Sequence, residues 1–135
     1  MPEPRDGLIV HPWGFRPSNK ESMGFGIDKT FVPTFKTLQE TIVELGHSGK
    51  TISTLALDCE GCEWDIYLDI LSLDASFQQI VMQMHGTPFV ANDLFLAMRK
   101  AGYVIFHKEA EPSGNGEVYD YSFMRMAPSY FDSKK

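Results

Sequence analysis

The chain places four acidic side chains, two cysteines and a tryptophan directly after a short apolar run, in the stretch Leu55–Asp65. The apolar residues predict a buried strand over 52–58, and the helical spacing that follows predicts a helix over 62–73. The acids therefore lie at the carboxyl end of a strand. Open α/β sheets bind ligands in the crevice beyond the carboxyl ends of their strands. The sequence thus predicts a functional site at this strand-to-helix junction.

Three side chains are candidates for catalysis there: Asp58, Glu60 and His85. Either carboxylate would hydrogen-bond an amine or hydroxyl of a ligand at the strand tip. His85 ends a predicted strand over 79–85, so parallel pairing with 52–58 would bring it to the same edge as Asp58. An imidazole beside a carboxylate is the usual arrangement of a general base. The alternatives are a solvated helix start, whose dipole favours acids, and a structural histidine.

Cys59 and Cys62 form a C-x-x-C motif at the same junction. Such a motif beside a strand–helix unit is typical of thioredoxin-like redox sites. Reactive cysteines need electropositive surroundings, however, and here four acids crowd the pair. Zinc would need two further soft ligands, and the sequence has no second C-x-x-C and no paired-histidine motif. We expect small packing residues, with redox and metal roles as alternatives.

Strands and helices alternate along the predicted chain. Predicted strands cover 8–15, 52–58, 79–85, 103–107 and 118–126, predicted helices cover 38–45, 62–73 and 91–101, and 16–32 is predicted as loop. The first helix begins at a capping-box pattern formed by Thr37 and Glu40. The alternation predicts an α/β fold with a mostly parallel sheet. The last two strands are joined by a turn over 112–116 and should form a C-terminal antiparallel hairpin.

The composition suits one folded domain of 135 residues, with 43% hydrophobic residues. The net charge of -6 argues against nucleic-acid binding, which needs a basic face to neutralise phosphates. No stretch approaches the roughly 20 apolar residues that a membrane-spanning helix requires.

Several motifs in the right order resemble one family. The segment 37–64, with its Thr-Leu and Glu-Leu-Gly-His helix and its strand ending in Asp-Cys-Glu-Gly-Cys-Glu-Trp, resembles the methyltransferase-like domain of animal and algal proteins related to FkbM-type O-methyltransferases. Upstream, 11–15 is similar to that family's third strand. Downstream, 83–85 is similar to its fifth strand, and 96–107 to its next helix and strand. The resemblance spans residues 8 to 126.

The resemblance implies a partial Rossmann-like methyltransferase fold that uses S-adenosylmethionine. It implies a hydroxyl acceptor on a small molecule or glycan, with Asp58 beside the methionine end of the cofactor. The family's glycine-rich first strand and the acid ending its second strand have no counterpart here. Cys59 and Cys62 replace aliphatic or small residues, and Gln83 replaces a glutamate. We therefore expect one domain over 1–135 that is the C-terminal half of a methyltransferase domain, inactive alone.

Two other functions are carried as alternatives, namely a non-catalytic binding or interaction module and a C-x-x-C redox protein. In the half-domain interpretation, strands 52–58, 79–85, 103–107 and 118–126 form one sheet. The strand over 52–58 then has an open flank, through which the chain would self-associate. Pro12 limits 8–15 to an edge position, from which it would cross over to pair with 52–58; the alternatives are that a second copy of the chain, or the upstream part of a longer protein, covers that flank.

Overall fold

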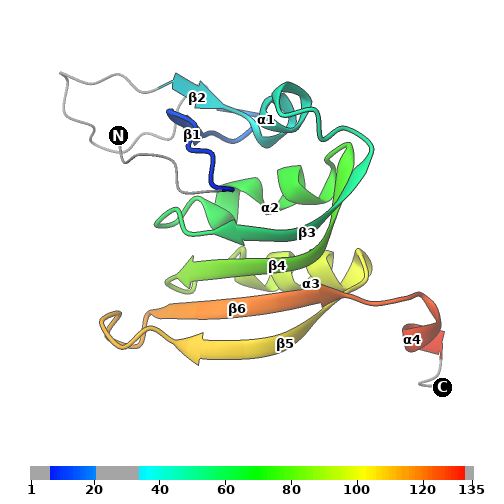
Figure 1. Ribbon diagram of the computed structural model, residues 1–135. Helices are drawn as coiled ribbons and strands as arrows, with labels where there is room; N and C mark the ends of the chain where they lie inside the picture. Colours follow the sequence, from blue (N-terminus) through cyan, green and yellow to red (C-terminus); the bar gives the residue numbers. More distant parts are fainter. Residues whose placement is uncertain (1–6, 21–33, 133–135) are drawn as a thin grey trace.

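The computed structural model describes residues 7–20 and 34–132 (Figure 1). In chain order its elements are β1 (Trp13–Phe15), β2 (Thr34–Lys36), α1 (Leu38–Glu44), β3 (Lys50–Leu57), α2 (Glu63–Leu71), β4 (Ala75–His85), α3 (Ala91–Lys100), β5 (Tyr103–Ala110), β6 (Val118–Arg125) and α4 (Ser129–Asp132). Every strand and helix predicted from residue 38 onward is present with slightly shifted ends, and β2 and α4 are additional. Residues 21–32 of the predicted loop lie outside the described residues.

The main sheet has the strand order β3-β4-β6-β5. The prediction that these four strands form one sheet is confirmed, and so is the antiparallel pairing of β5 with β6. The prediction of a mostly parallel sheet is wrong. Strand β6 inserts between β4 and β5 and runs antiparallel to both, so only the β3–β4 pairing is parallel in this mixed sheet. The short turn after β5 requires that β6 pair antiparallel with it. Helix α3 connects β4 to β5 across the position of β6, which leaves room for β6 between these two strands.

The core lies between the sheet and the helices α2 and α3, which contact each other and pack behind the strands in Figure 1. Alternate residues of β4 point toward these helices, as the two-residue period of a strand requires. The fully or almost fully buried apolar side chains of this core include Ile66, Ile70, Ile80, Met82, Met84, Leu94, Met98 and Phe123. Burying each such side chain contributes about 1.5–3 kcal/mol, and together they hold the β3-to-α2 junction in place.

The buried face of α2 differs from the predicted one. The spacing of Trp64, Leu68 and Leu71 predicted an inward face, but Leu68 is 58% exposed. Ile66 and Ile70 enter the core instead, while Trp64 and Leu71 pack at its margin. Apolar side chains project from most sides of α2, so its sequence contains two overlapping apolar stripes. Only packing against the sheet selects one of them.

Strand β1 forms a separate two-stranded parallel sheet with β2. The prediction that 8–15 pairs with 52–58 is therefore wrong, because β2, a strand that the sequence did not predict, provides the partner. Among the described strands β3 pairs only with β4, so its other edge is open there. This leaves the predicted open flank in place within the described part of the chain.

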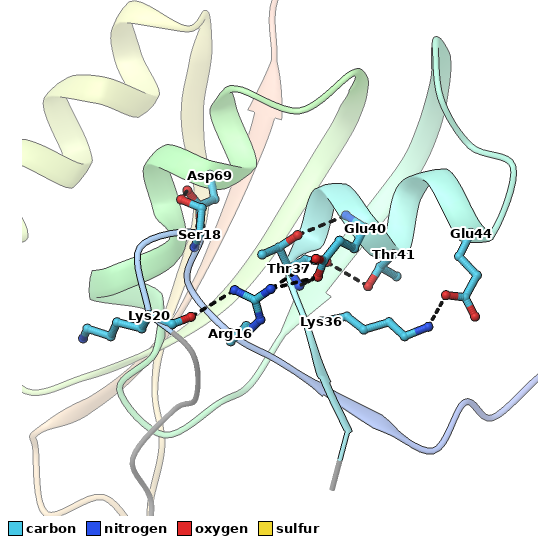
Figure 2. Close-up of polar contacts among 9 residues, drawn as sticks. All are labelled: Arg16, Ser18, Lys20, Lys36, Thr37, Glu40, Thr41, Glu44 and Asp69. Atoms are coloured by element: carbon cyan, nitrogen blue, oxygen red, sulfur yellow. Dashed lines mark hydrogen bonds and ion pairs between the residues drawn. The ribbon is translucent and has the colours of Figure 1, made fainter.

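Polar side chains fasten the segment after β1 to the helices (Figure 2). Arg16 Nη2 lies 3.1 Å from a carboxylate oxygen of Glu40, at the start of α1. Ser18 donates its backbone N–H and its hydroxyl to Asp69 of α2, at 2.8 and 2.7 Å. The N-terminal segment is thus tied to both helices by charge-assisted contacts.

The capping box predicted at the start of α1 is confirmed. Thr37 Oγ1 accepts the backbone N–H of Glu40 at 3.1 Å, and Glu40 Oε2 accepts that of Thr37 at 2.7 Å. The hydrogen bond from the Thr37 backbone, assisted by the positive charge of Arg16, lowers the pKa of the Glu40 carboxyl despite opposing desolvation. The local sequence therefore sets where this helix begins.

One pH-dependent contribution to stability comes from Tyr103. This side chain is 5% exposed, and its hydroxyl donates to the Phe77 carbonyl at 2.6 Å. Burial raises the pKa of the Tyr103 phenol above its ordinary value, which is about 10. A raised folded-state pKa gives stability that is complete below the unfolded pKa and is lost as the pH rises through the folded pKa.

We expect the free energy of unfolding to fall more steeply above about pH 10 in the wild type than in Tyr103→Phe. Urea denaturation from about pH 8 to about pH 11 measures both curves. The two proteins differ only in this hydroxyl, so the difference between the curves isolates Tyr103. Parallel curves would contradict this assignment.

Candidate functional site

A tight turn over residues 58–62 joins β3 to α2. Glu60 and Gly61 both have left-handed backbones, with φ values of 51° and 110°. Glycine adopts this region freely, whereas a residue such as Glu60 is strained there by about 1–3 kcal/mol. Strained residues cluster at functional sites, where the surrounding structure holds them. The sharp turn thus folds the acidic stretch back over the end of the sheet.

Glu63, the first residue of α2, connects this turn to the end of β4. Its side chain is 0% exposed. Its Oε2 accepts the backbone N–H of Gly61 at 2.9 Å, and its Oε1 accepts the backbone N–H of His85 at 2.7 Å. A buried carboxylate needs such donors, because an unpaired one is very costly to remove from water. Glu63 is therefore the central polar residue of the junction.

The imidazole of His85 lies against the same carboxylate. Its Nδ1 is 3.1 Å from Glu63 Oε1, and its side chain is 23% exposed. Because a carboxylate only accepts, Nδ1 carries the hydrogen in this contact, and Nε2 of the neutral ring is left as an acceptor. Trp64 Nε1 also donates to the His85 carbonyl at 2.8 Å. The result is an oriented imidazole–carboxylate pair at the carboxyl ends of the parallel strands β3 and β4.

The other predicted site residues occupy the same edge of the sheet without contacting His85. Asp58 and Glu60 are exposed after the end of β3. The β3–β4 register places Asp58 level with Gln83, two residues before His85. No described hydrogen bond or ion pair joins either acid to His85, whose carboxylate partner is Glu63 rather than the predicted Asp58. The catalytic roles of these residues stay predictions.

Sequence reasoning missed the part played by Glu63. An acid in the first turn of a helix is normally solvated and stabilised by the helix dipole, and it was interpreted in that way. Its position between Cys62 and Trp64, which both pack inward, was a signal of burial. That signal shows which side Glu63 faces, but not which histidine it contacts.

Cys59 and Cys62 are joined by a disulfide, with their Cα atoms 5.4 Å apart. The expectation of two unbonded packing residues is therefore wrong, although Cys62 is indeed packed and only 1% exposed. The left-handed turn at Glu60 and Gly61 brings the two cysteines within bridging distance. Cys59 Sγ also lies 3.7 Å from Glu63 Oε2, so the disulfide borders the carboxylate.

A metal centre, a membrane span and a cavity are other features that residues 7–20 and 34–132 could provide. No cluster of three or more histidine, cysteine or acidic residues in that part of the chain could hold a metal ion. None of the helices described there has the length and apolar character needed to span a membrane. A cavity of about 520 Å³ lies among α3, β5 and α4 and includes none of the junction residues. The candidate site, at the carboxyl ends of β3 and β4, is therefore separate from this cavity.

The fold and this site define a class of protein: an α/β domain that carries an oriented histidine at the carboxyl ends of its parallel strands, the place where open α/β sheets generally bind ligands. Within that class, a family described as "Methyltransferase domain" matches residues 3–125. The chain belongs to this methyltransferase domain family. The predicted resemblance to methyltransferases is thus confirmed at the level of the domain family. No curated protein and no solved structure matches the chain.

Proposed function

We propose that the chain is the acceptor-side half of a methyltransferase domain related to the FkbM type, which transfers a methyl group from S-adenosylmethionine to a hydroxyl. Membership of the methyltransferase domain family supports methyl transfer as the activity. The contact of His85 with buried Glu63 supports a hydroxyl as the acceptor, because a hydroxyl must lose its proton as it is methylated and the imidazole can take that proton. The acceptor is a small molecule or a glycan.

In this proposal His85 is the general base. Its Nε2 takes the proton of the acceptor hydroxyl, and Glu63 stabilises the imidazolium that forms. Proton transfer by a positioned side chain contributes about 10²–10⁴-fold to a rate. The exposed carboxylate of Glu60 hydrogen-bonds the acceptor's hydroxyl groups. S-adenosylmethionine, when bound, supplies an electrophilic methyl group on a sulfonium.

The described residues fit only one end of that cofactor. Asp58 is exposed at the tip of β3, where its carboxylate can accept from the amino group of the methionine moiety. No described strand-to-helix turn is glycine-rich in the G-x-G-x-x-G manner that close approach of a nucleotide requires. We propose that Asp58 holds this end, and that a complete site needs a further segment to hold the adenosine.

Binding of the acceptor is testable with this chain alone. We expect a monosaccharide or alcohol from a panel of hydroxyl compounds to shift the NMR signals of the His85 ring and of the Glu60 amide. Glu60→Gln should weaken this binding by about 5–10-fold, because it replaces a hydrogen bond to a charged group by a neutral one. Asp74→Asn, which changes an exposed acid just before β4, at the opposite end of that strand from His85, is the matched control.

Two outcomes would count against this assignment. One is a panel in which no compound binds. The other is a compound that binds equally to Glu60→Gln and to the wild type. The alternative of a non-catalytic binding module rests on the missing glycine-rich turn, and the cofactor titration described in the Discussion separates the two.

A further inference from the structure

The Cys59–Cys62 disulfide closes the turn at the candidate site. The proposed methyl transfer gives this disulfide no role. We propose that this disulfide is a redox switch that sets the position of the Glu63 carboxylate and, through it, of the His85 imidazole. The proposal concerns regulation of the site, and its test does not depend on methyl transfer.

Direct contacts couple the disulfide to the site. The turn that the bond closes includes Gly61, whose N–H donates to Glu63 Oε2, and Cys59 Sγ lies 3.7 Å from the same oxygen. The other carboxylate oxygen, Oε1, holds the backbone and the ring of His85. A movement of the turn therefore alters the hydrogen bond to Oε2 of Glu63. The carboxylate then shifts, and its Oε1 changes its contacts with His85.

The two cysteines differ in exposure, which defines the course of reduction. A thiolate of a dithiol reductant attacks Sγ of Cys59, which is partly exposed, whereas Cys62 is buried. The S–S bond breaks, and its electron pair goes to Cys62 Sγ, which takes up a proton. The second thiolate of the reductant then attacks its own sulfur in the mixed disulfide and releases Cys59, which is protonated in turn. The reductant becomes a disulfide, and the cysteines gain two electrons and two protons.

Reduction changes the environment of Glu63 in two ways. The sulfurs are no longer bonded, so Cys59 can move outward and the strained left-handed backbone of Glu60 can relax. The new S–H of Cys59 is also a donor that competes with Gly61 for Glu63 Oε2. Both changes loosen the carboxylate that orients His85.

The surrounding charges favour a switch over a redox catalyst. Asp58, Glu60, Glu63 and Asp65 all lie within a few residues of the two cysteines. Negative neighbours disfavour the thiolate that rapid exchange requires. The pair therefore keeps its oxidation state until a reductant acts on it, as a regulatory bond must.

The experiment follows the site while the full chain is reduced with dithiothreitol. The indole N–H signal of Trp64, which donates to the His85 carbonyl, and the ring signals of His85 should both shift. Exchange of the Gly61 and His85 amides should accelerate about tenfold, the factor expected when a hydrogen bond to a charged group weakens. The double variant Cys59→Ser, Cys62→Ser should resemble the reduced protein and not respond to dithiothreitol.

Signals from the core provide the internal control. The methyl signal of Met98 and the ring signals of Phe77 should stay in place on reduction, because both side chains are buried and Phe77 is level with Ile52, five residues before the end of β3. The proposal is overturned if reduction leaves Trp64, His85 and both amides unchanged, if the core signals move as well, or if dithiothreitol does not reduce the folded protein. These readouts need no cofactor or acceptor, so their failure would leave the proposed methyl transfer standing.

Discussion

Titration of S-adenosylmethionine into the 135-residue chain is expected to show no binding in the micromolar range. A Kd of 1 µM corresponds to about -8 kcal/mol. A hydrogen bond to the exposed carboxylate of Asp58 contributes only about 1.5–3 kcal/mol. The described residues provide no glycine-rich turn for close approach of the adenosine. Isothermal titration calorimetry with S-adenosylmethionine and with S-adenosylhomocysteine measures the affinity directly.

The variant Asp58→Asn shows what any residual binding means. Millimolar binding that this variant abolishes would support a half-site for the methionine end of the cofactor. No binding at all to wild type or variant would favour the non-catalytic module. Micromolar binding by the wild-type chain would contradict our proposal that adenosine is held by a further segment.

Replacing Glu63 by alanine is expected to lower the free energy of unfolding by about 2–6 kcal/mol, because a buried N–H left without an acceptor costs about 1–3 kcal/mol and two are left here. The N–H groups of Gly61 and His85 would lose their acceptor. Urea denaturation at neutral pH measures the change. Glu63→Gln should cost less, because it keeps the shape and one acceptor oxygen while placing an amide against a donor.

A neighbouring acid provides the matched control. Asp65 lies on the exposed side of the same helical turn and pairs with Lys20 at 2.8 Å, with both side chains largely in water. Surface ion pairs of this kind contribute about 0–1 kcal/mol, so Asp65→Ala should have little effect. If Glu63→Ala proved as mild as Asp65→Ala, the central position of Glu63 at the junction would be wrong.

The local sequence was enough to predict most of the elements. The capping box at Thr37 and Glu40 defines the start of α1 through two hydrogen bonds within four residues. The apolar run before Asp58 likewise predicted β3, because residues close together in sequence decide the periodicity of burial. The placement of a functional junction at the carboxyl edge follows from these two kinds of local information.

Contacts between residues distant in sequence decided the strand order and the partner of His85. Strand β6 inserts between β4 and β5 because hydrogen-bond partners are chosen across the sheet, and no local pattern records that choice. Burial likewise selected Glu63, among several neighbouring acids, as the partner of His85, 22 residues away. A carboxylate becomes a paired, oriented group only where the fold removes it from water and supplies its donors. Local patterns were enough to place Asp58, Glu60 and His85 at one junction, whereas long-range packing made Glu63 the partner of His85.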